Sequence, residues 1–270
     1  MSLTALWTAA QRARESARPD RLLDDTLAGT LAGPEGARMM EIMDSGQQPS
    51  PTVAIRSRYF DDRLTARTSD GARQIVLVGA GMDSRAFRLG LAADVTVFEI
   101  DQPDLLALKD QRLARAGARP TCVRRVVSCD LDGAWADALR ASGFSTSEQS
   151  VFVAEGLLMY LDEAGVERLL GDLSRLASPG SSLLADVCGQ SFRDSPYMTA
   201  WFAAMERAGM AWRFGTDEPE ALLAPHGWQA DVVRYGDEGA HFGRWTGPRV
   251  DRHDLAWPHS YLVDARRLEE

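Results

Sequence analysis

A glycine-rich turn follows a short apolar run in the first third of the chain. The run Gln74–Gly79 leads into Gly79-Ala80-Gly81, where two glycines let the backbone turn tightly and let a ligand approach it closely. The dinucleotide fingerprint G-x-G-x-x-G would place its third glycine at position 84, but this chain has serine there. The turn therefore predicts a small-molecule site, and the serine argues against NAD.

Acidic side chains follow four further apolar runs. Glu99 and Asp101 lie about 20 residues beyond the glycine turn, where an acid accepts hydrogen bonds from the hydroxyls of a ribose. Side-chain alternation along a strand puts both on the same side, so either one fits this role. The other three runs end in Asp130-Leu131, Glu155-Gly156 and Asp186.

These residue types suit a ligand that carries positive charge. S-adenosylmethionine presents an adenosine, a sulfonium, an ammonium and a carboxylate, and acids suit all of these except the carboxylate. Asp130 beside Leu131 suits the amino edge and the face of the adenine. The carboxylate needs a cation, and Arg56 or Arg58 can pair with it through two parallel hydrogen bonds. The pyrophosphate of a dinucleotide would be repelled by so many acids, which favours S-adenosylmethionine.

A parallel sheet would bring the ends of these runs together. Near-continuous apolar runs indicate strands buried on both faces, and predicted helices alternate with them. The pattern predicts an α/β fold with a doubly wound, mostly parallel sheet that binds ligands at its carboxyl edge. The predicted strands are 74–79, 95–100, 123–129, 151–155, 182–187, 230–235 and 260–265.

The first 70 residues follow a helical pattern instead. Apolar residues recur at helical spacing over 3–18, and a second helix over 22–32 is predicted to end at Gly33-Pro34. An exposed link spans 45–51, after which Thr52 is expected to cap a third helix. We therefore expect an N-terminal helical lid over 1–70 and a cofactor-binding domain over 71–270.

The composition excludes several classes of function. The 30 basic and 39 acidic residues give a net charge of −9, which argues against binding to nucleic acid. No apolar run approaches the ~20 residues of a membrane span. The three cysteines lie in apolar contexts, which favours reduced thiols and a cytoplasmic location, and the four histidines lack the spacing of a metal site.

Five motifs in order resemble the bacterial branch of the leucine carboxyl methyltransferase family, which includes polyketide carboxyl O-methyltransferases. They are R-S-R-Y-F-D-D at 56–62, V-G-A-G-M-D-S-R at 78–85, F-E-I-D-Q-P at 98–103, C-D-L at 129–131 and A-E-G-L-L-M-Y-L at 154–161. The resemblance implies a class I methyltransferase fold of seven strands, one of them antiparallel near the end of the chain. It also implies S-adenosylmethionine as cofactor and a helical N-terminal region over the site.

The same resemblance implies a role for each motif residue. Arg56 or Arg58 would hold the methionine carboxylate of the cofactor, and the Gly79-Ala80-Gly81 turn would pack against its methionine portion. Asp101 would bind the ribose, Asp130 with Leu131 would frame the adenine, and Glu155 with Gly156 would face the ammonium of the cofactor or its methionine end.

The methyl acceptor is predicted from weaker signals. An ionised carboxylate needs no general base, and the strand-end motifs offer none, so we expect transfer to a carboxylate, or to a hydroxyl, of a small apolar molecule such as a natural product. Insertions at about 189–225 and 238–258 would shape its pocket, with Tyr160, Tyr197 and Trp201 as candidate lining residues. Two alternatives stay open: an NAD-linked oxidoreductase on the same fold class, and a methyltransferase-like module that binds partners without catalysis.

Overall fold

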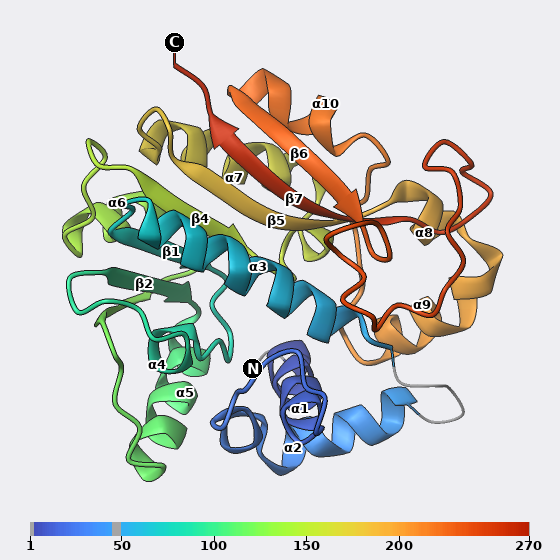
Figure 1. The fold of residues 1–270 in the computed structure, drawn as a ribbon, viewed down its shortest axis with the longest axis horizontal. Coiled ribbons are helices and arrows are strands. Elements are labelled where there is room, and N and C mark those ends of the chain that lie inside the picture. Colours follow the sequence, from blue (N-terminus) through green and yellow to red (C-terminus); the bar gives the residue numbers. More distant parts are fainter. Residues whose placement is uncertain (1–2, 45–49, 270) are drawn as a thin grey trace.

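A seven-stranded sheet forms the centre of the protein (Figure 1). The structure is a computed structural model that describes residues 3–44 and 50–269. Across the sheet the strand order is β3-β2-β1-β4-β5-β7-β6. The strands are β1 (Gln74–Val78), β2 (Thr96–Asp101), β3 (Val123–Ser128), β4 (Ser150–Ala154), β5 (Ser182–Cys188), β6 (Trp228–Arg234) and β7 (Ser260–Arg267).

The register of the sheet aligns the carboxyl ends of its central strands. β1 to β5 are mutually parallel, and β7 runs antiparallel to both of its neighbours, β5 and β6. Val78 at the end of β1 pairs with Ile100 near the end of β2, and Asp101 pairs with Ser128 at the end of β3. The predicted doubly wound, mostly parallel sheet with one antiparallel strand near the chain end is therefore confirmed.

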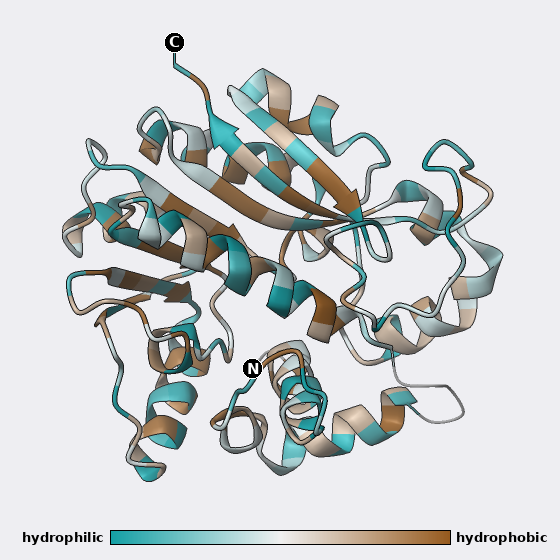
Figure 2. Ribbon diagram, viewed as in Figure 1, coloured by the Kyte–Doolittle hydropathy of each residue, from teal (hydrophilic) through white to brown (hydrophobic). Residues whose placement is uncertain are grey.

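Helices cover both faces of the sheet, as continuous apolar strands require. Every residue of β1, β4 and β5 is buried, and Figure 2 shows apolar residues concentrated along the strands. Ile55, Phe60 and Leu64 from α3 (Thr52–Ser69) pack on one face, whereas Leu169 and Leu173 from α7 (Glu163–Leu176) pack on the other. The helices after β1 are α4 (Arg85–Arg88), α5 (Pro103–Arg115), α6 (Trp135–Ala141), α7 (Glu163–Leu176), α8 (Gln190–Asp194), α9 (Thr199–Arg207) and α10 (Pro219–Leu223).

The N-terminal helices occupy two different places. α3 (Thr52–Ser69) lies along the sheet, while α1 (Leu3–Ser16) and α2 (Ala28–Asp44) lie beyond the carboxyl ends of the strands (Figure 1). The predicted end of the second helix at Gly33-Pro34 is confirmed, because Gly33 has non-helical backbone angles (φ 59°, ψ −174°) and a separate helical segment follows it to Asp44. The predicted start at 22 is wrong, since α2 begins at Ala28. Pro34 can begin the new segment, since the first turn of a helix needs no N–H partner.

The expected cap at Thr52 is also wrong. Pro51 occupies the N-cap position of α3, and Thr52 shares a hydrogen bond of 3.0 Å with Ser50 instead. Residues 45–49 of the predicted exposed link lie outside the described part of the chain.

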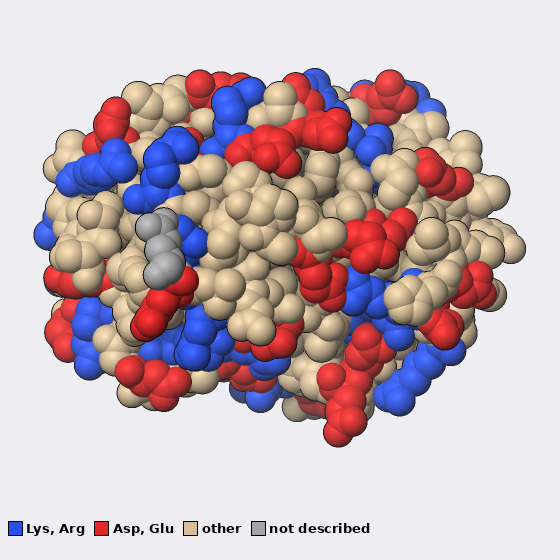
Figure 3. Space-filling model, turned by 90° about the horizontal axis from the view of Figure 1, so that it is seen from above, with Lys and Arg blue, Asp and Glu red and all other residues tan. Residues whose placement is uncertain are grey.

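Charges of both signs are interspersed on the surface. In the face shown in Figure 3, basic side chains lie among acidic ones. Among the helices of residues 3–44 and 50–269, none is both long and apolar enough to cross a bilayer.

Candidate cofactor and acceptor site

One large pocket opens at the carboxyl edge of the sheet. It has a volume of about 880 Å³, at the upper end of the roughly 300–1,000 Å³ typical of small-molecule sites. Its walls come from the ends of β1 to β5, from one face of α1, and from residues 192–212. The pocket therefore lies at the carboxyl edge of the sheet, where the predicted parallel strands led us to expect a ligand site.

The glycine turn forms the floor of this pocket. Gly79 and Gly81 both have positive φ, at 70° and 46°, which is why the turn needs glycine. A Cβ added to Gly81 would lie only 3.1 Å from the Cβ of Ala5, so α1 packs directly on the turn. The backbone N–H of Ala80 donates to the carbonyl of Ile100 at 2.9 Å and holds the turn against β2.

Asp101, and not Glu99, faces the pocket from β2. The Oδ2 atom of Asp101 accepts a hydrogen bond of 2.7 Å from the N–H of Gly81, which couples this carboxylate to the glycine turn. Burial raises the pKa of Asp101, although two backbone N–H groups oppose the shift.

Glu99 lies outside the pocket, which removes it from the predicted cofactor-binding residues. Its Oε2 atom lies 2.8 Å from Nζ of Lys109 and 2.7 Å from a guanidinium nitrogen of Arg124. The carboxyl of Glu99 and the ammonium of Lys109 are both fully buried, so they form a structural ion pair inside the fold. Lys109 is the only lysine of the chain.

Arg56 is the pocket arginine of the R-S-R motif. Its Nε donates to Glu155 Oε1 at 2.9 Å and its Nη1 donates to Asp186 Oδ2 at 2.7 Å. Burial alone would lower the pKa of Arg56, but Asp186 and Glu155 outweigh it and hold that pKa above its usual value. Arg58 does not line the pocket: it is half-exposed and pairs with Asp62 on α3 at 2.8 Å.

The two acids that contact Arg56 have opposite pKa shifts. Burial raises the pKa of Asp186, against the opposing charge of Arg56 and the N–H of Gly156, which donates to Asp186 at 2.5 Å. Burial acts on Glu155 in the same direction, but Arg85 and Arg56 together outweigh it and lower the pKa of Glu155. Glu155 is therefore ionised at neutral pH.

Arg85 extends these contacts into a buried network. It reaches Asp61 at 2.7 Å, Glu155 at 2.7 Å, and also Asp83.

Seven acids and four arginines line the pocket in the described part of the chain, so its lining carries an excess of negative charge. The arginines are Arg12, Arg56, Arg85 and Arg88, and the acids are Asp44, Asp83, Asp101, Asp130, Asp132, Glu155 and Asp186.

The other half of the pocket is aromatic. Trp201 and Trp212 meet edge to face with ring centroids 4.8 Å apart, and Phe192 stacks on Trp212 at 5.9 Å. Tyr160 contacts Trp212 at 6.2 Å, and all four side chains line the pocket. We call Tyr160, Phe192, Trp201 and Trp212 the aromatic wall.

Tyr197 does not belong to this wall, and its predicted place in the pocket is wrong. It is 79% exposed and stacks on Trp257, with centroids 6.5 Å apart. Tyr197 lies in a 3₁₀ turn, Pro196–Met198, before α9 begins, so it is not on the helix that carries Trp201 into the pocket.

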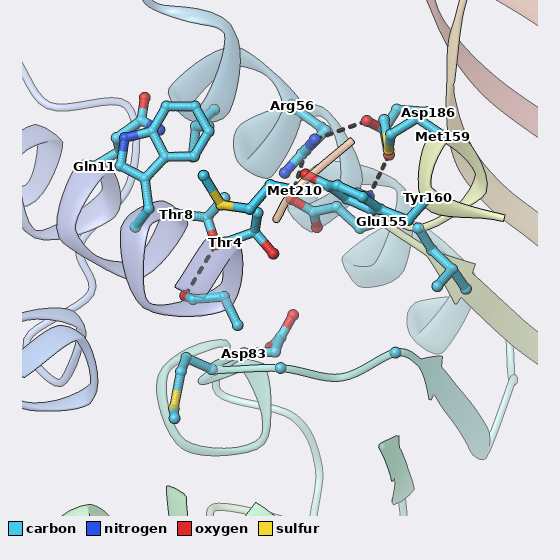
Figure 4. A pocket seen from close by; sticks show the side chains of 18 of the residues that line it. Thr4, Thr8, Gln11, Arg56, Asp83, Glu155, Met159, Tyr160, Asp186 and Met210 are labelled. Carbon is cyan, nitrogen blue, oxygen red and sulfur yellow. Dashed lines mark hydrogen bonds and ion pairs between the residues drawn. The ribbon is translucent and has the colours of Figure 1, made fainter. Parts of the chain in front are cut away.

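The structure brings the remaining predicted residues together and adds others. Ala80, Asp130, Leu131 and Gly156 all line the pocket, as do Tyr160 and Trp201. The sequence reasoning missed the pocket-facing side of α1, where Thr4, Thr8 and Gln11 face Arg56, Glu155 and Tyr160 across the pocket (Figure 4). It also missed Tyr235 and Trp245, which follow β6 and lack any motif.

The strand order, the glycine turn after β1 and the acids at the ends of β2 to β5 define a class I methyltransferase fold. A family model of leucine carboxyl methyltransferases matches residues 5–174. The chain belongs to this family, and the family predicted from the sequence is confirmed.

Relatives of this chain support that membership. One from Parafrankia is 40% identical, over 85% of this chain and 77% of its own length. Another, from Mycobacterium ulcerans, is 37% identical over 98% of this chain and 94% of its own. Both carry the provisional designation of S-adenosyl-L-methionine-dependent methyltransferase.

Solved structures agree on the fold. A protein from Thermobifida fusca that is provisionally described as a methyltransferase matches with a TM-score of 0.63 and 17% identity, covering 93% of this chain and 95% of that one. Magnesium protoporphyrin IX methyltransferase from Synechocystis, with bound SAH, matches with a TM-score of 0.51 and 13% identity, covering 87% and 94%. At these identities the likeness concerns the fold alone.

Proposed function

We propose that this protein transfers a methyl group from S-adenosylmethionine to a carboxylate of a small, apolar acceptor. The observation that carries the proposal is the convergence of the glycine turn with Asp101, Asp130 and Glu155 in one pocket of net acidic lining. A lining with seven acids and four arginines suits a cofactor that bears a sulfonium and an ammonium. The designations of the relatives agree with this cofactor.

The residues present fit the polar groups of that cofactor. Asp101 lies at the end of β2 beside the glycine turn, where its carboxylate can accept from the ribose hydroxyls. Asp130 and Leu131 at the end of β3 would frame the adenine, and ionised Glu155 would face the ammonium. The bound cofactor supplies an activated methyl group, and the protein's task is to hold the acceptor oxygen in line with it.

The aromatic wall indicates the character of the acceptor. Its rings are rigid and apolar, and such surfaces contact flat or apolar ligands at little conformational cost. A carboxylate in this pocket is already ionised at neutral pH, whereas a phenol would have to lose a proton first. None of the four histidines lies among the described residues that line the pocket. Burial also raises the pKa values of Tyr160 and Tyr235, so neither serves as a base at neutral pH.

The oxidoreductase alternative is not favoured. Ser84 stands where the third glycine of a dinucleotide fingerprint would be, and its hydroxyl is buried and donates to Asp25 at 2.6 Å. The acidic lining would also repel a pyrophosphate. The activity assay below distinguishes a methyltransferase from a non-catalytic binding module.

Calorimetry and a methyl-transfer assay test the proposal. We expect the purified protein to bind S-adenosylhomocysteine and not NAD, and absence of S-adenosylhomocysteine binding would overturn it. The second experiment supplies radiolabelled S-adenosylmethionine with a panel of small aromatic and aliphatic acids. A carboxyl methyl ester releases labelled methanol in mild alkali, whereas a base-stable product would refute the carboxylate assignment. Cofactor binding without transfer to any member of a broad acid and phenol panel would favour the non-catalytic module.

A further inference from the structure

The aromatic half of the pocket is built from uncharged residues. Every residue between 192 and 212 that lines the pocket is apolar: Phe192, Met198, Trp201, Ala208, Gly209, Met210 and Trp212. On the α2 side, Met43 lines the pocket together with Asp44, whose carboxylate is paired with Arg14. A ligand group that enters this half therefore meets no unpaired charge from these residues.

A cluster of methionines joins the aromatic wall to α1 and α2. Met39, Met205 and Met210 form this buried cluster, and of the three only Met210 lines the pocket. Seven partly buried residues pack against the cluster, and all of them line the pocket: Leu3, Trp7, Met43, Tyr160, Trp201, Ala208 and Trp212. Met210 is therefore the member of the cluster that a ligand in this half would contact.

The end of α9 fixes the backbone that carries Met210. Gly209 takes the left-handed conformation, with φ of 72°, and its N–H donates to the carbonyl of Glu206 at 2.9 Å. The N–H of Met210 donates to the carbonyl of Met205 at 2.8 Å. These two bonds form a Schellman motif, in which the residues joined by the outer bond also pack together. The position of Met210 is thus set by the way the helix ends.

Met210 stands where the two halves of the pocket meet. Three residues after it, the N–H of Arg213 donates to the carbonyl of Met159 at 2.7 Å, which ties the segment to the pocket wall. Figure 4 shows the Met210 side chain in the space between Thr8 of α1 and Arg56 on the facing side. An acceptor that presents its reacting group to the cofactor in the acidic half and rests its body on the aromatic wall has to pass Met210.

The lining of the aromatic half also restricts the charge of that body. A charged group that leaves water for apolar surroundings loses its hydration, and it needs a partner there to offset the loss. The sulfonium of the cofactor is such a partner for one carboxylate at the reacting end. A second charge further along the molecule would lie among the uncharged residues between 192 and 212.

We propose that Met210 limits the width of the acceptor's body, and that this body is apolar and carries no charge of its own. The acceptor is then a monocarboxylic acid with an uncharged chain or ring system, and dicarboxylic acids of the same length are rejected. The inference rests on the proposed function, which supplies the cofactor and the reacting carboxylate. It adds a specificity-determining residue that no sequence motif marks.

A pair of acids tests the charge with the wild-type protein. The full chain is saturated with sinefungin, a stable analogue of the cofactor that carries an amine in place of the methylated sulfur. Calorimetry then compares decanoate with decanedioate, which has the same length and a second carboxylate. We expect decanoate to bind at least about fivefold more tightly. A smaller difference, or binding by neither decanoate nor 2-naphthoate, would overturn the proposal.

Variants at position 210 test the width. The probes are 2-naphthoate and the wider 1-pyrenecarboxylate, which carry the same reacting group. Met210→Ala should raise the affinity for 1-pyrenecarboxylate relative to 2-naphthoate at least about fivefold, because it opens space for the larger ring system. Met210→Leu keeps the volume of the side chain and should leave this ratio within about twofold of wild type. Met40→Ala, at a partly buried methionine of α2 outside the pocket lining, is the matched control and should do the same.

The width limit is wrong if Met210→Ala leaves the ratio unchanged, or if Met210→Leu or Met40→Ala shifts it as much. Sinefungin affinity and the thermal unfolding midpoint show whether each variant is folded. If Met210→Ala is not, Met210→Val repeats the test with a smaller cavity. A wild-type protein that binds neither sinefungin nor S-adenosylhomocysteine refutes the proposed function instead, and so does methyl transfer to phenols alone. The two failures are therefore distinguishable.

Discussion

Asp101 and Glu99 offer a paired test, because these two acids lie two residues apart on β2 and have different surroundings. Asp101 faces the pocket and accepts from the N–H of Gly81 at 2.7 Å. Glu99 is buried between Lys109 and Arg124 at 2.8 and 2.7 Å. We expect Asp101→Asn to weaken cofactor binding and Glu99→Gln to destabilise the fold.

The magnitudes follow from what each change removes. Asp101→Asn keeps the shape and one oxygen but loses one charged hydrogen bond to a ribose hydroxyl, about 1.5–3 kcal/mol, or roughly 10- to 150-fold in Kd. Glu99→Gln leaves Lys109 facing a neutral amide in the interior, which costs about 3–5 kcal/mol when a buried pair is broken. Arg124 keeps a second partner, Asp110, at 2.8 Å, so we expect the lower end of that range. At about 2–4 °C per kcal/mol, the unfolding midpoint should fall by roughly 6–12 °C.

Two measurements on the same three proteins separate these effects. Calorimetry with S-adenosylhomocysteine at a temperature where all three are folded gives the affinities, and thermal unfolding without ligand gives the stabilities. Asp101→Asn should lose affinity for S-adenosylhomocysteine, with an unfolding midpoint within about 3 °C of wild type. Glu99→Gln should keep the affinity of wild type and have the lower unfolding midpoint. The reasoning is refuted if Asp101→Asn binds as tightly as wild type, or if Glu99→Gln loses as much affinity as Asp101→Asn.

Three further predictions concern the glycine turn, the pH dependence of the stability and the role of Arg58. Gly81→Ala forces a side chain onto a backbone with φ of 46° and against Ala5, so it should cost about 1–2 kcal/mol in urea unfolding and weaken S-adenosylhomocysteine; an unchanged urea midpoint would contradict the loop geometry. Burial alone would raise the pKa of Asp83, but Arg85 outweighs it and brings that pKa to about 2, below the 3.8 of the free group. This stabilisation, about 2 kcal/mol, is therefore present above pH 4 and is lost as the pH falls from about 4 towards 2, so the urea midpoint should fall less over that range in Asp83→Asn than in wild type. Arg58→Ala should leave S-adenosylhomocysteine affinity unchanged because Arg58 lies outside the pocket, and a tenfold loss would show that it contacts the cofactor.

The fold was predictable because its signals are local. The fully buried strands β1 and β4 are continuous apolar runs after their first residue, and the turn after β1 needs glycine at two positions whatever surrounds it. The acids at strand ends converge because parallel strands of one sheet end at the same edge. The family predicted from the motifs is confirmed by the match over residues 5–174.

The choice of the pocket-facing residue between Glu99 and Asp101 depended on contacts with residues that are distant in sequence. Glu99 and Asp101 share one side of β2, but two strand residues span roughly 7 Å, so only Asp101 reaches the edge. Lys109 and Arg124, which bury Glu99, carry no signal that marks them as its partners. The choice between Arg56 and Arg58 follows from helix geometry, because residues two positions apart on a helix face different ways and only one of them can point into the pocket.

The pocket-facing residues of α1, which include Thr4, Thr8 and Gln11, had no sequence signal at all. Gln11 occupies a position that any solvated helix face could hold, and its burial comes from the packing of α1 on the glycine turn. Trp245 lies in the segment between β6 and β7, which has neither helix nor strand and follows no periodicity.

Because Lys109 is buried, chemical labelling of its amino group reports when the fold opens around it. Lys109 is the only lysine of the chain and its side chain is fully buried, so an amine-directed label meets no accessible ε-amino group on the folded domain. Apart from the α-amine at the start of the chain, each label that attaches records a molecule in which α5 has separated from the sheet, which is a local or global unfolding event. Labelling rates with and without cofactor would therefore measure how ligand binding changes the frequency of these openings.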